Sequence, residues 1–464
     1  MKIRFRTNIS WKASFALTLT MSLLLALSPA VVAQQAVKVR VDFKETVLKN
    51  GLRVITAEDH RAPVISLALT YKVGAANERP GRTGFAHLFE HIMFRGTKNV
   101  KGEDYMNLIF NNGGSINAST GTDVTFYFAA VPANQLELPL FLEADRLRGL
   151  VITQDVLDTE SNVVQEERRL RIDNQPYGKS RWVLNGLLYD NFPYQHDPIG
   201  SIEDLKAAKV ADVQQFFNTY YAPNNLVLVL VGDFKTDEAV AKVRKYFEDI
   251  PRQPDPPAVD LSEPEQKAER RTAVEDALAR APQVSLGFKA SRGNTPDLYA
   301  LQILSAALGG GRSSRLYQKL VKEREIVNDI SCSVDERAGP GALYITATLR
   351  PDKKTEETEA AIYEEIERIR PEPLSDLELE KAKNATTLAF ISKIQTSLFR
   401  AIFISLYAGY FNDPNLINTW LDKTDAVTKE DVARVVEKYL RPTNRTVVIT
   451  MPKAKAASTG TSGQ

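Results

Sequence analysis

The sequence predicts an α+β fold made of two homologous domains, each with a mixed or antiparallel sheet covered by helices. Two observations lead to this prediction. A helix, a proline turn and a β-branched strand in residues 211–231 recur in residues 430–449, with Asp, Val, Tyr, Pro and Asn at one constant offset. Strand and helix patterns also interleave without the strict alternation that a doubly wound parallel sheet requires. A duplicated α+β domain accounts for both observations.

Residues 1–33 have the pattern of a secretory signal peptide. Four cations precede an uncharged, largely apolar run from Ala13 to about Leu27, and a small-residue stretch ends at Ala33. An N-terminal membrane anchor is the alternative, but the apolar run is shorter than the roughly 20 residues needed to span a bilayer. Cleavage before Gln34 removes four cations and no acids, which changes the formal net charge from +1 to −3.

The predicted export suits the bacterial periplasm. The single cysteine, Cys332, can form no internal disulfide, which fits this compartment better than a eukaryotic secretory route. No cysteine stands near the cleavage point, so a lipid anchor is not expected. We therefore expect a soluble, mildly acidic periplasmic protein without a stable membrane anchor.

The first predicted domain covers residues 34–250. Alternating or β-branched runs favour strands at 53–55, 65–73 and 124–131. Helical spacing and composition favour helices at 84–94, 136–148 and 155–173. The proline-rich and charge-rich segment 251–272 holds neither a helix nor a central strand, and is predicted to be an extended, semi-rigid linker.

The second predicted domain covers residues 273–452. Strands are expected at 284–288 and 343–349, and helical segments at 298–308, 314–324 and 375–405. The tail from 453 to 464 is rich in Ala, Ser, Thr and Gly and is predicted to be disordered.

Composition excludes several classes of protein. The chain has 464 residues, of which 25% are charged and 43% hydrophobic, and its formal net charge is +1. These values are those of an ordinary folded protein, not of collagen, low-complexity disorder or a multi-span membrane protein. A near-zero charge without a clustered basic surface also argues against a nucleic-acid-binding protein.

One short motif indicates metal chemistry. His87, Glu90 and His91 form a His-x-x-Glu-His sequence, in which the two histidines lie four residues apart and on one face of a helix. Two imidazoles so placed can hold one zinc ion, and Glu90 can reach a water on the metal as a general base. The alternative to a metal site is a structural role, in which the two histidines belong to the core and the glutamate caps the helix. His60 and His196 stand in polar segments and are interpreted as plain loop residues.

A catalytic zinc needs a third protein ligand and an open position for water. Acidic candidates cluster downstream at Glu160, Glu166 and Glu167, on a predicted helix. The sequence pattern by itself does not choose among them.

These motifs together resemble the pitrilysin, insulysin and mitochondrial processing peptidase family of inverted-motif zinc peptidases. The resemblance covers essentially the whole mature chain. It includes the Glu-x-x-Val-Val pattern that begins at Glu160, the Gly-Gly-Ser-Ile-Asn-Ala stretch that begins at Gly113, the segment from Tyr220 to Asp233, and the Gly-rich Ser-Arg-Leu segment at 309–316.

The resemblance implies a fold, a site and a reaction. Family spacing places the third zinc ligand at Glu167 and a supporting acid at Glu160, with Glu166 as the one-residue alternative. In this family two such domains form one half of a clam-like chamber that admits unfolded peptides. The stretch with Ser115, Asn117 and Ala118 matches the family's edge strand, which binds the substrate backbone as one more strand.

One departure from the family pattern implies a partner. Members that act alone carry an arginine and a tyrosine after the Ser-Arg-Leu helix, to hold the substrate carbonyl and stabilise the oxyanion. Val321 and Asn328 stand at those positions here, and neither can replace these groups. Arg324 lies one turn away as a possible substitute. By family analogy, a homologous subunit lacking the zinc motif supplies Arg and Tyr, as in a heterodimeric bacterial member.

The sequence therefore predicts a zinc-dependent endopeptidase subunit with one Zn²⁺ per chain. The alternative is a non-catalytic scaffold or peptide-binding subunit of the same family. Such members typically lose the zinc residues, whereas this chain keeps the full set.

Overall fold

The computed structural model describes residues 40–453; the predicted signal peptide and the predicted tail beyond residue 453 lie outside the described residues. The strands of the first half are β1 Lys44–Val47, β2 Arg53–Glu58, β3 Val64–Tyr71, β4 Ser115–Thr120, β5 Thr125–Pro132 and β6 Leu226–Gly232. Those of the second half are β7 Arg270–Asp276, β8 Gln283–Arg292, β9 Val327–Asp335, β10 Pro340–Leu349 and β11 Arg445–Pro452.

Helices accompany both groups of strands. The first half has α2 Phe85–Ile92, α3 Gly102–Asn111, α4 Glu137–Gly149, α5 Gln154–Arg168, α6 Gly178–Leu188, α7 Phe192–Gln195, α8 Ile202–Lys206, α9 Val210–Tyr220 and α10 Thr236–Phe247. The second half has α11 Pro296–Gly309, α12 Thr355–Arg368, α13 Asp376–Lys393, α14 Ser397–Phe411, α15 Leu416–Asp425 and α16 Lys429–Tyr439. There are two short π-helical segments: η3 Arg169–Asp173 follows α5, and η5 Tyr317–Glu323 precedes β9.

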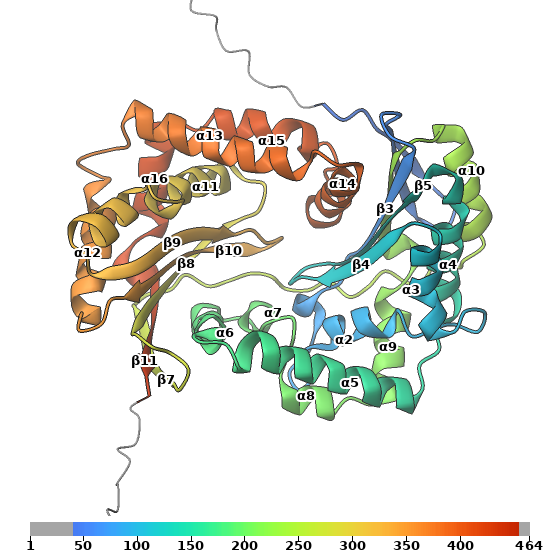
Figure 1. Ribbon diagram of the computed structural model, residues 1–464, viewed down its shortest axis with the longest axis horizontal. Helices are drawn as coiled ribbons and strands as arrows, with labels where there is room; N and C mark the ends of the chain where they lie inside the picture. Colours follow the sequence, from blue (N-terminus) through green and yellow to red (C-terminus); the bar gives the residue numbers. More distant parts are fainter. Residues whose placement is uncertain (1–39, 454–464) are drawn as a thin grey trace, which may run out of the picture. The chain divides into compact units, whose positions relative to one another are not determined.

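The two sheets have the same topology, which confirms the predicted α+β fold with a duplicated domain (Figure 1). The first sheet has the order β1-β2-β6-β3-β5-β4, and the second the order β7-β11-β8-β10-β9. Apart from the additional β1, each strand of the first sheet has a counterpart at the same position in the second. Each sheet has one parallel pair, which is β2 with β6 in the first and β7 with β11 in the second. The other neighbouring strands are antiparallel.

The repeated sequence segment forms the same structure in both halves. It comprises α9, a 3₁₀ turn and β6 in the first half, and α16, a 3₁₀ turn and β11 in the second. The amide of Asn225 donates to the carbonyl of Tyr220 at 2.8 Å, and the amide of Asn444 donates to the carbonyl of Tyr439 at 2.7 Å. The recurring Tyr, Pro and Asn are therefore the residues that build one turn between a helix and a buried strand.

Each sheet is covered on one face by a helix from the other half of the chain. Helix α14 packs on β3 and β6, where the Thr70 hydroxyl donates to the Ser405 hydroxyl at 2.9 Å. Helix α6 packs on β8 and β11, where the hydroxyls of Ser180 and Thr450 lie 2.6 Å apart. Every residue of β6 is buried, because α14 covers one face and the core of the first half, which includes Leu226, Leu228 and Leu230, covers the other.

The predicted helical stretch 375–405 is in fact two helices, α13 and α14, which meet at an angle of 110°. The break has a local cause, because the Thr396 side chain accepts a hydrogen bond from the Phe399 backbone and caps a new helix. Among the described residues no single helix is long and apolar enough to cross a bilayer; only this bent pair, taken together, reaches the required length and composition.

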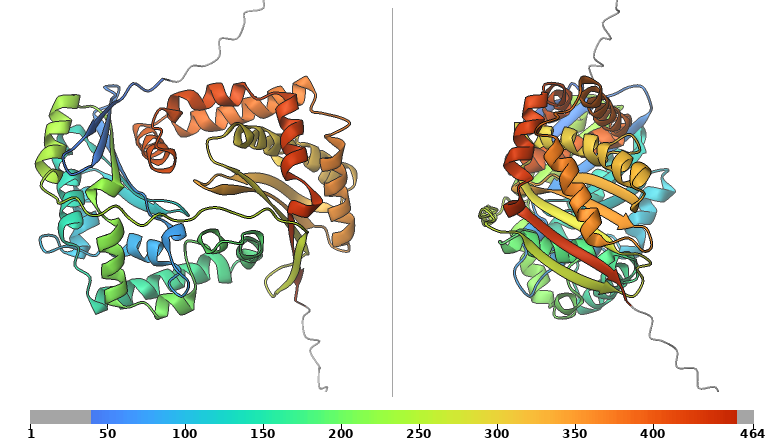
Figure 2. Two further views of the ribbon diagram at one scale, coloured as in Figure 1. Left: turned by 180° about the vertical axis from the view of Figure 1, so that it is seen from behind. Right: turned by 90° about the vertical axis from the view of Figure 1, so that its left-hand side faces the viewer.

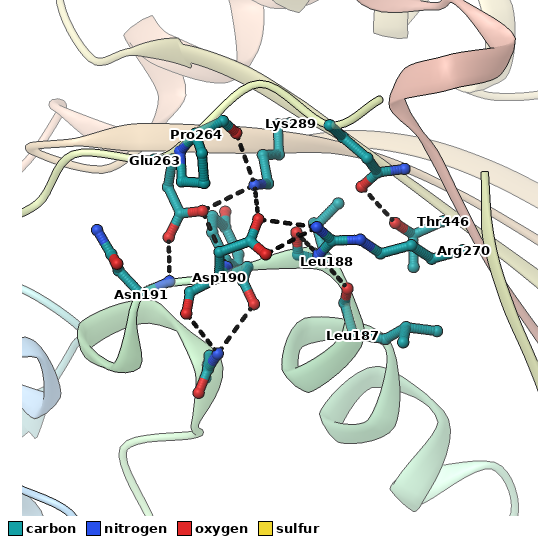
Figure 3. A network of polar contacts seen from close by, with 12 residues as sticks. Leu187, Leu188, Asp190, Asn191, Glu263, Pro264, Arg270, Lys289 and Thr446 are labelled. Carbon is teal, nitrogen blue, oxygen red and sulfur yellow. Dashed lines mark hydrogen bonds and ion pairs between the residues drawn. The ribbon is translucent and has the colours of Figure 1, made fainter. Parts of the chain in front are cut away.

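The predicted linker 251–272 has no helix or strand between residues 251 and 269, and Figure 2 shows this part as a long extended stretch. Its last three residues instead begin the edge strand β7, so the second domain starts earlier than predicted. The end of the extended stretch is held by a polar network (Figure 3). The Lys289 ammonium on β8 lies 2.8 Å from Glu263 of this segment and 2.6 Å from Asp190, which follows α6. Glu263 also accepts hydrogen bonds from the backbone of Asp190 and Asn191. One buried cation thus joins the linker to both halves.

Candidate metal centre

The helix that carries His-x-x-Glu-His begins at a glycine for a steric reason. Gly84 has φ +85°, and a Cβ there would lie 2.8 Å from the carbonyl oxygen of Ile199. The apolar residues of α2 then pack into the core, where the ring of Phe89 lies 4.3 Å from that of Tyr221. This packing fixes the helix, so that its histidines point toward α5.

A buried acid–histidine pair anchors the start of α2. The Glu78 carboxylate accepts hydrogen bonds from the backbone of Gly84 at 2.9 Å and of Ala86 at 2.8 Å. His196 lies 2.9 Å from the same carboxylate. The sequence interpretation of His196 as a plain loop residue was therefore incomplete. Its Nε2 partners, Ala75 and Glu78, are more than a hundred positions away, so no local pattern signals them.

Three donor atoms converge between α2 and α5. The Nε2 atoms of His87 and His91 lie 3.7 Å and 3.3 Å from Oε2 of Glu167, and all three donors lie within 4.8 Å of one another. Tetrahedral ligands about 2.0–2.1 Å from a zinc ion are separated by about 3.3 Å. Two imidazole nitrogens and one carboxylate oxygen at this spacing fit zinc better than the hard cations.

Protonation of the histidines follows their surroundings. Burial lowers the pKa of His87 to about 3, with a further contribution from the nearby charges of His91 and Arg171. His87 therefore presents a neutral imidazole, which is the form that binds metal. Burial opposes the charge of His91 as well, but the neighbouring Glu160 and Glu167 carboxylates outweigh it and raise the pKa of that imidazole.

Glu160 lies beneath the site and supports it. Its side chain is fully buried, with Oε2 3.3 Å from Nδ1 of His91 and Oε1 2.6 Å from Nε of Arg95. A carboxylate at the second ring nitrogen orients an imidazole ligand. Although burial opposes its ionisation, contacts with His91 and Arg95 lower the pKa of Glu160, so it remains an anion.

Glu90 borders the three donors. Its Oε2 accepts a hydrogen bond of 2.6 Å from the Thr120 hydroxyl at the end of β4. Burial raises the pKa of Glu90, and the hydrogen bond from Thr120 acts in the opposite direction. A raised pKa makes a carboxylate a stronger proton acceptor near neutral pH. Thr120 was not singled out from the sequence.

The other acidic and histidine candidates lie outside this cluster. Glu166 has a side chain that is 57% exposed and pairs with Arg169 at 2.7 Å. His60 is exposed and contacts Asp233 at 2.7 Å. Within residues 40–453, the structure thus brings Glu167, not Glu166, to the two histidines of the motif.

The predicted substrate strand is the free edge of the first sheet. β4 pairs only with β5, so one side of it has no strand neighbour among the described residues. The Ala118 amide donates to the Asn117 side chain at 2.8 Å, which shows that this N–H points away from β5. Ser115 begins the strand and is exposed. The last residue of β4, Thr120, contacts Glu90, so the strand leads directly to the three donors.

The residues at the predicted clamp positions have other roles in the described structure. Val321 is buried within η5, and the Asn328 side chain donates to the carbonyl of Leu349 at 2.9 Å. Arg324, considered as a substitute, forms an ion pair with Glu364 of α12. Val321 has no donor, and the side-chain contacts of Asn328 and Arg324 are made to other residues of the second half.

A cavity of about 360 Å³ opens beside His87. Its lining combines apolar groups with charged side chains from two segments, η3 and the loop before α8: His87, Thr120, Arg171, Ile172, Asp197, Pro198 and Ile199. The cavity therefore joins the donor cluster, the end of β4 and a charged rim.

Comparison with known proteins identifies relatives along most of the chain. Residues 53–182 match the model of the insulinase domain, peptidase family M16, and residues 207–386 match that of the peptidase M16 inactive domain. The zinc protease PqqE of Helicobacter pylori is 30% identical over 410 residues, which are 87% of this chain and 92% of that protein.

Comparison with solved structures also finds peptidases along most of the chain. A protease from Helicobacter pylori superposes with a TM-score of 0.83 at 29% identity, over 89% of this chain and all of that one. The periplasmic protease PqqL of Escherichia coli shares the fold, with a TM-score of 0.72 at 18% identity. The match covers 89% of this chain but 48% of PqqL, and 93% of the chain that represents the first half of PqqL.

Proposed function

Because the chain belongs to peptidase family M16, we propose that it is the zinc-carrying subunit of an endopeptidase that hydrolyses unfolded peptides in the bacterial periplasm. The observation that carries the proposal is the convergence of the donor atoms of His87, His91 and Glu167 within 4.8 Å of one another. Glu90 precedes His91 on the same helix. A non-catalytic scaffold has no need for this arrangement, and the non-catalytic members of the family typically lose these residues.

The residues of the site have distinct tasks. When bound, zinc would polarise the scissile carbonyl and make a water molecule more acidic. His87, His91 and Glu167 hold the ion, and Glu160 orients the His91 ring through Nδ1. Glu90 takes the proton of the attacking water on its carboxylate and delivers it to the leaving amine. The Thr120 hydroxyl fixes the direction of that carboxylate.

β4 presents the substrate to these groups. An extended peptide added to its free edge receives backbone hydrogen bonds irrespective of sequence. Recognition by backbone groups suits a peptidase of unfolded chains, because a folded substrate offers few free extended segments. Ser115, Asn117 and Ala118 are the residues proposed to line this peptide.

Location and processing form part of the proposal. Residues 1–33 have the three-part pattern of a signal peptide, and the Escherichia coli protein with this fold is named a periplasmic protease. We expect the mature protein to begin at or near Gln34 and to be recovered from the periplasmic fraction. N-terminal sequencing that finds Met1 on membrane-bound protein would contradict this.

The experiment that tests the reaction replaces Glu90 with Gln, in the chain combined with its homologous partner. Glutamine keeps the size of the side chain and an oxygen for Thr120 but cannot accept a proton, so hydrolysis of an unstructured peptide should fall at least 10²–10⁴-fold. Zinc content should stay at the wild-type level. A matched control is Glu166→Gln, which alters an exposed carboxylate on the neighbouring helix. Wild-type hydrolysis by the Glu90→Gln variant would show that the assigned role is wrong.

A further inference from the structure

We propose that Arg171 is a positioning residue that keeps Glu167 bound to the metal through one oxygen only. This inference rests on the proposed function, because it concerns the third ligand of the same site. It assigns a task to a residue that neither the sequence motif nor the donor cluster includes.

The two oxygens of Glu167 face different partners. Oε2 is the oxygen that lies 3.3–3.7 Å from the two imidazole Nε2 atoms. Oε1 lies 2.6 Å from Nη1 of Arg171, one helical turn further along. One oxygen is therefore directed at the metal position while the other is held by a guanidinium. This ion pair favours an orientation of the carboxylate in which Oε2 alone is directed at the ion.

The backbone around Arg171 is specialised. The chain leaves α5 for the π-helical segment Arg169–Asp173, where the amide of Asn174 donates to the carbonyl of Arg169 at 2.7 Å. Single π-helical turns within helices occur frequently at functional sites. The following turn is fixed as well, since the Tyr177 amide donates to Asp276 of β7 at 2.6 Å. Arg171 therefore extends from a segment whose path is anchored.

An ordinary surface ion pair is the simpler alternative. The Arg171 side chain is 72% exposed, and exposed helical pairs contribute only about 0.3–0.5 kcal/mol. The same helix supplies an example of such a pair, because Arg169 holds the exposed Glu166 at 2.7 Å. Arg171 differs in its surroundings. It lines the cavity beside His87, and its partner carboxylate is only 17% exposed.

The test compares zinc affinity in the full-length chain and its Arg171→Gln and Arg169→Gln variants, by competition with a chromophoric chelator. We expect Arg171→Gln to bind zinc 10–100-fold more weakly, the typical loss when a group that supports a ligand is removed. Arg169→Gln should stay within about twofold of wild type, as expected for an exposed pair. Arg171→Lys, which keeps a donor and a charge, should recover part of the loss.

A second readout follows the coordination itself. The Co²⁺-substituted Arg171→Gln variant should show weaker d–d absorption than wild type, because a carboxylate that binds through two oxygens raises the coordination number. If the wild-type chain binds zinc, an unchanged zinc affinity and an unchanged cobalt spectrum in Arg171→Gln would overturn the inference. A wild-type chain that binds no zinc would instead overturn the proposed function, and the inference with it. The metal-free Arg171→Gln and Arg169→Gln variants should unfold at the same temperature as the metal-free wild-type chain, which would show that both substitutions leave the fold intact.

Discussion

Glu166 and Glu167 are adjacent in the chain, yet only one of their carboxylates faces the histidines. Glu160 and Glu167 are seven residues apart, or nearly two turns of α5, so they share the face turned toward α2. Glu166 is rotated away from that face and pairs with Arg169. Helical phase, anchored on the buried Glu160, is therefore the physical signal that separates the two candidates.

This difference gives a prediction at the residue scale. Glu167→Gln should reduce bound zinc to a small fraction of one ion per chain, because a neutral amide replaces an anionic ligand. Glu166→Gln should keep the wild-type zinc content. Metal analysis of the purified variants after dialysis checks both. Zinc lost from Glu166→Gln and kept by Glu167→Gln would reverse the assignment.

Other residues of the site could not be found from the sequence. His87, Glu90 and His91 form one local motif, and their spacing alone indicates a shared helical face. Thr120, by contrast, comes from a strand thirty residues later, and His196 reaches the start of α2 from a distant loop. Contacts of this kind are made by the tertiary fold, so no periodicity or local spacing encodes them.

At the scale of elements, β4 is the segment that we propose connects the fold to the reaction. Without a resemblance to known proteins, the sequence of residues 113–118 indicates only a turn and the start of a strand. The structure makes it the edge of a sheet, with the Ala118 N–H on the open side. Because this N–H is not part of the β5 ladder, it can be removed without breaking the sheet.

Ala118→Pro should therefore raise KM for an unstructured peptide and leave zinc bound. The loss of one backbone hydrogen bond corresponds to about 0.5–1.5 kcal/mol, or roughly 2–12-fold, and the proline ring adds a steric obstacle at the edge. Ala118→Ser keeps the N–H and serves as the control. Peptide hydrolysis measured over a range of substrate concentrations distinguishes KM from kcat. A wild-type KM in the Ala118→Pro variant would argue against peptide addition at this edge.

Secondary structure was predictable where the pattern is long, and less so at breaks. The predicted strands at 53–55, 65–73 and 124–131 correspond to β2, β3 and β5. The break between α13 and α14 was missed because residues 394–396 contain no glycine or proline, and the apolar pattern continues across them. The π-helical form of Tyr317–Glu323 was missed as well, since its composition is that of any helix.

At the scale of the whole molecule, duplication was predictable and its consequences were not. Five recurring residues revealed two homologous domains, because they build the same turn before the same buried strand. The exchange of α6 and α14 between the two sheets left no trace in the sequence. Each helix must match a sheet that lies far away along the chain, and only the folded structure pairs them.

The residues at the predicted clamp positions lead to a prediction about partnership. Val321 and Asn328 stand there, where the family resemblance implies an arginine and a tyrosine. The purified chain alone should hydrolyse peptides very slowly, because losing an oxyanion donor costs about 10²–10³ in rate where it has been measured. A homologous subunit that lacks the zinc motif and carries Arg and Tyr should restore activity.

The assay for this prediction compares three preparations with one unstructured peptide: the lone chain, the chain with that subunit, and a Val321→Arg/Asn328→Tyr variant. The two complemented preparations should be more active than the lone chain, although the buried position of Val321 makes the variant the less efficient of the two. Full activity of the unmodified chain by itself would refute the two-subunit account.

The central claim is that His87, His91 and Glu167 hold a zinc ion on which peptide hydrolysis depends. Its most direct test is zinc analysis of the purified chain, followed by peptide hydrolysis with the partner before chelation, after chelation and after zinc is returned. The account predicts one zinc per chain, loss of hydrolysis on chelation and recovery with zinc. A chain that binds no zinc at neutral pH, or hydrolysis that continues at the same rate after the metal is removed, would contradict it.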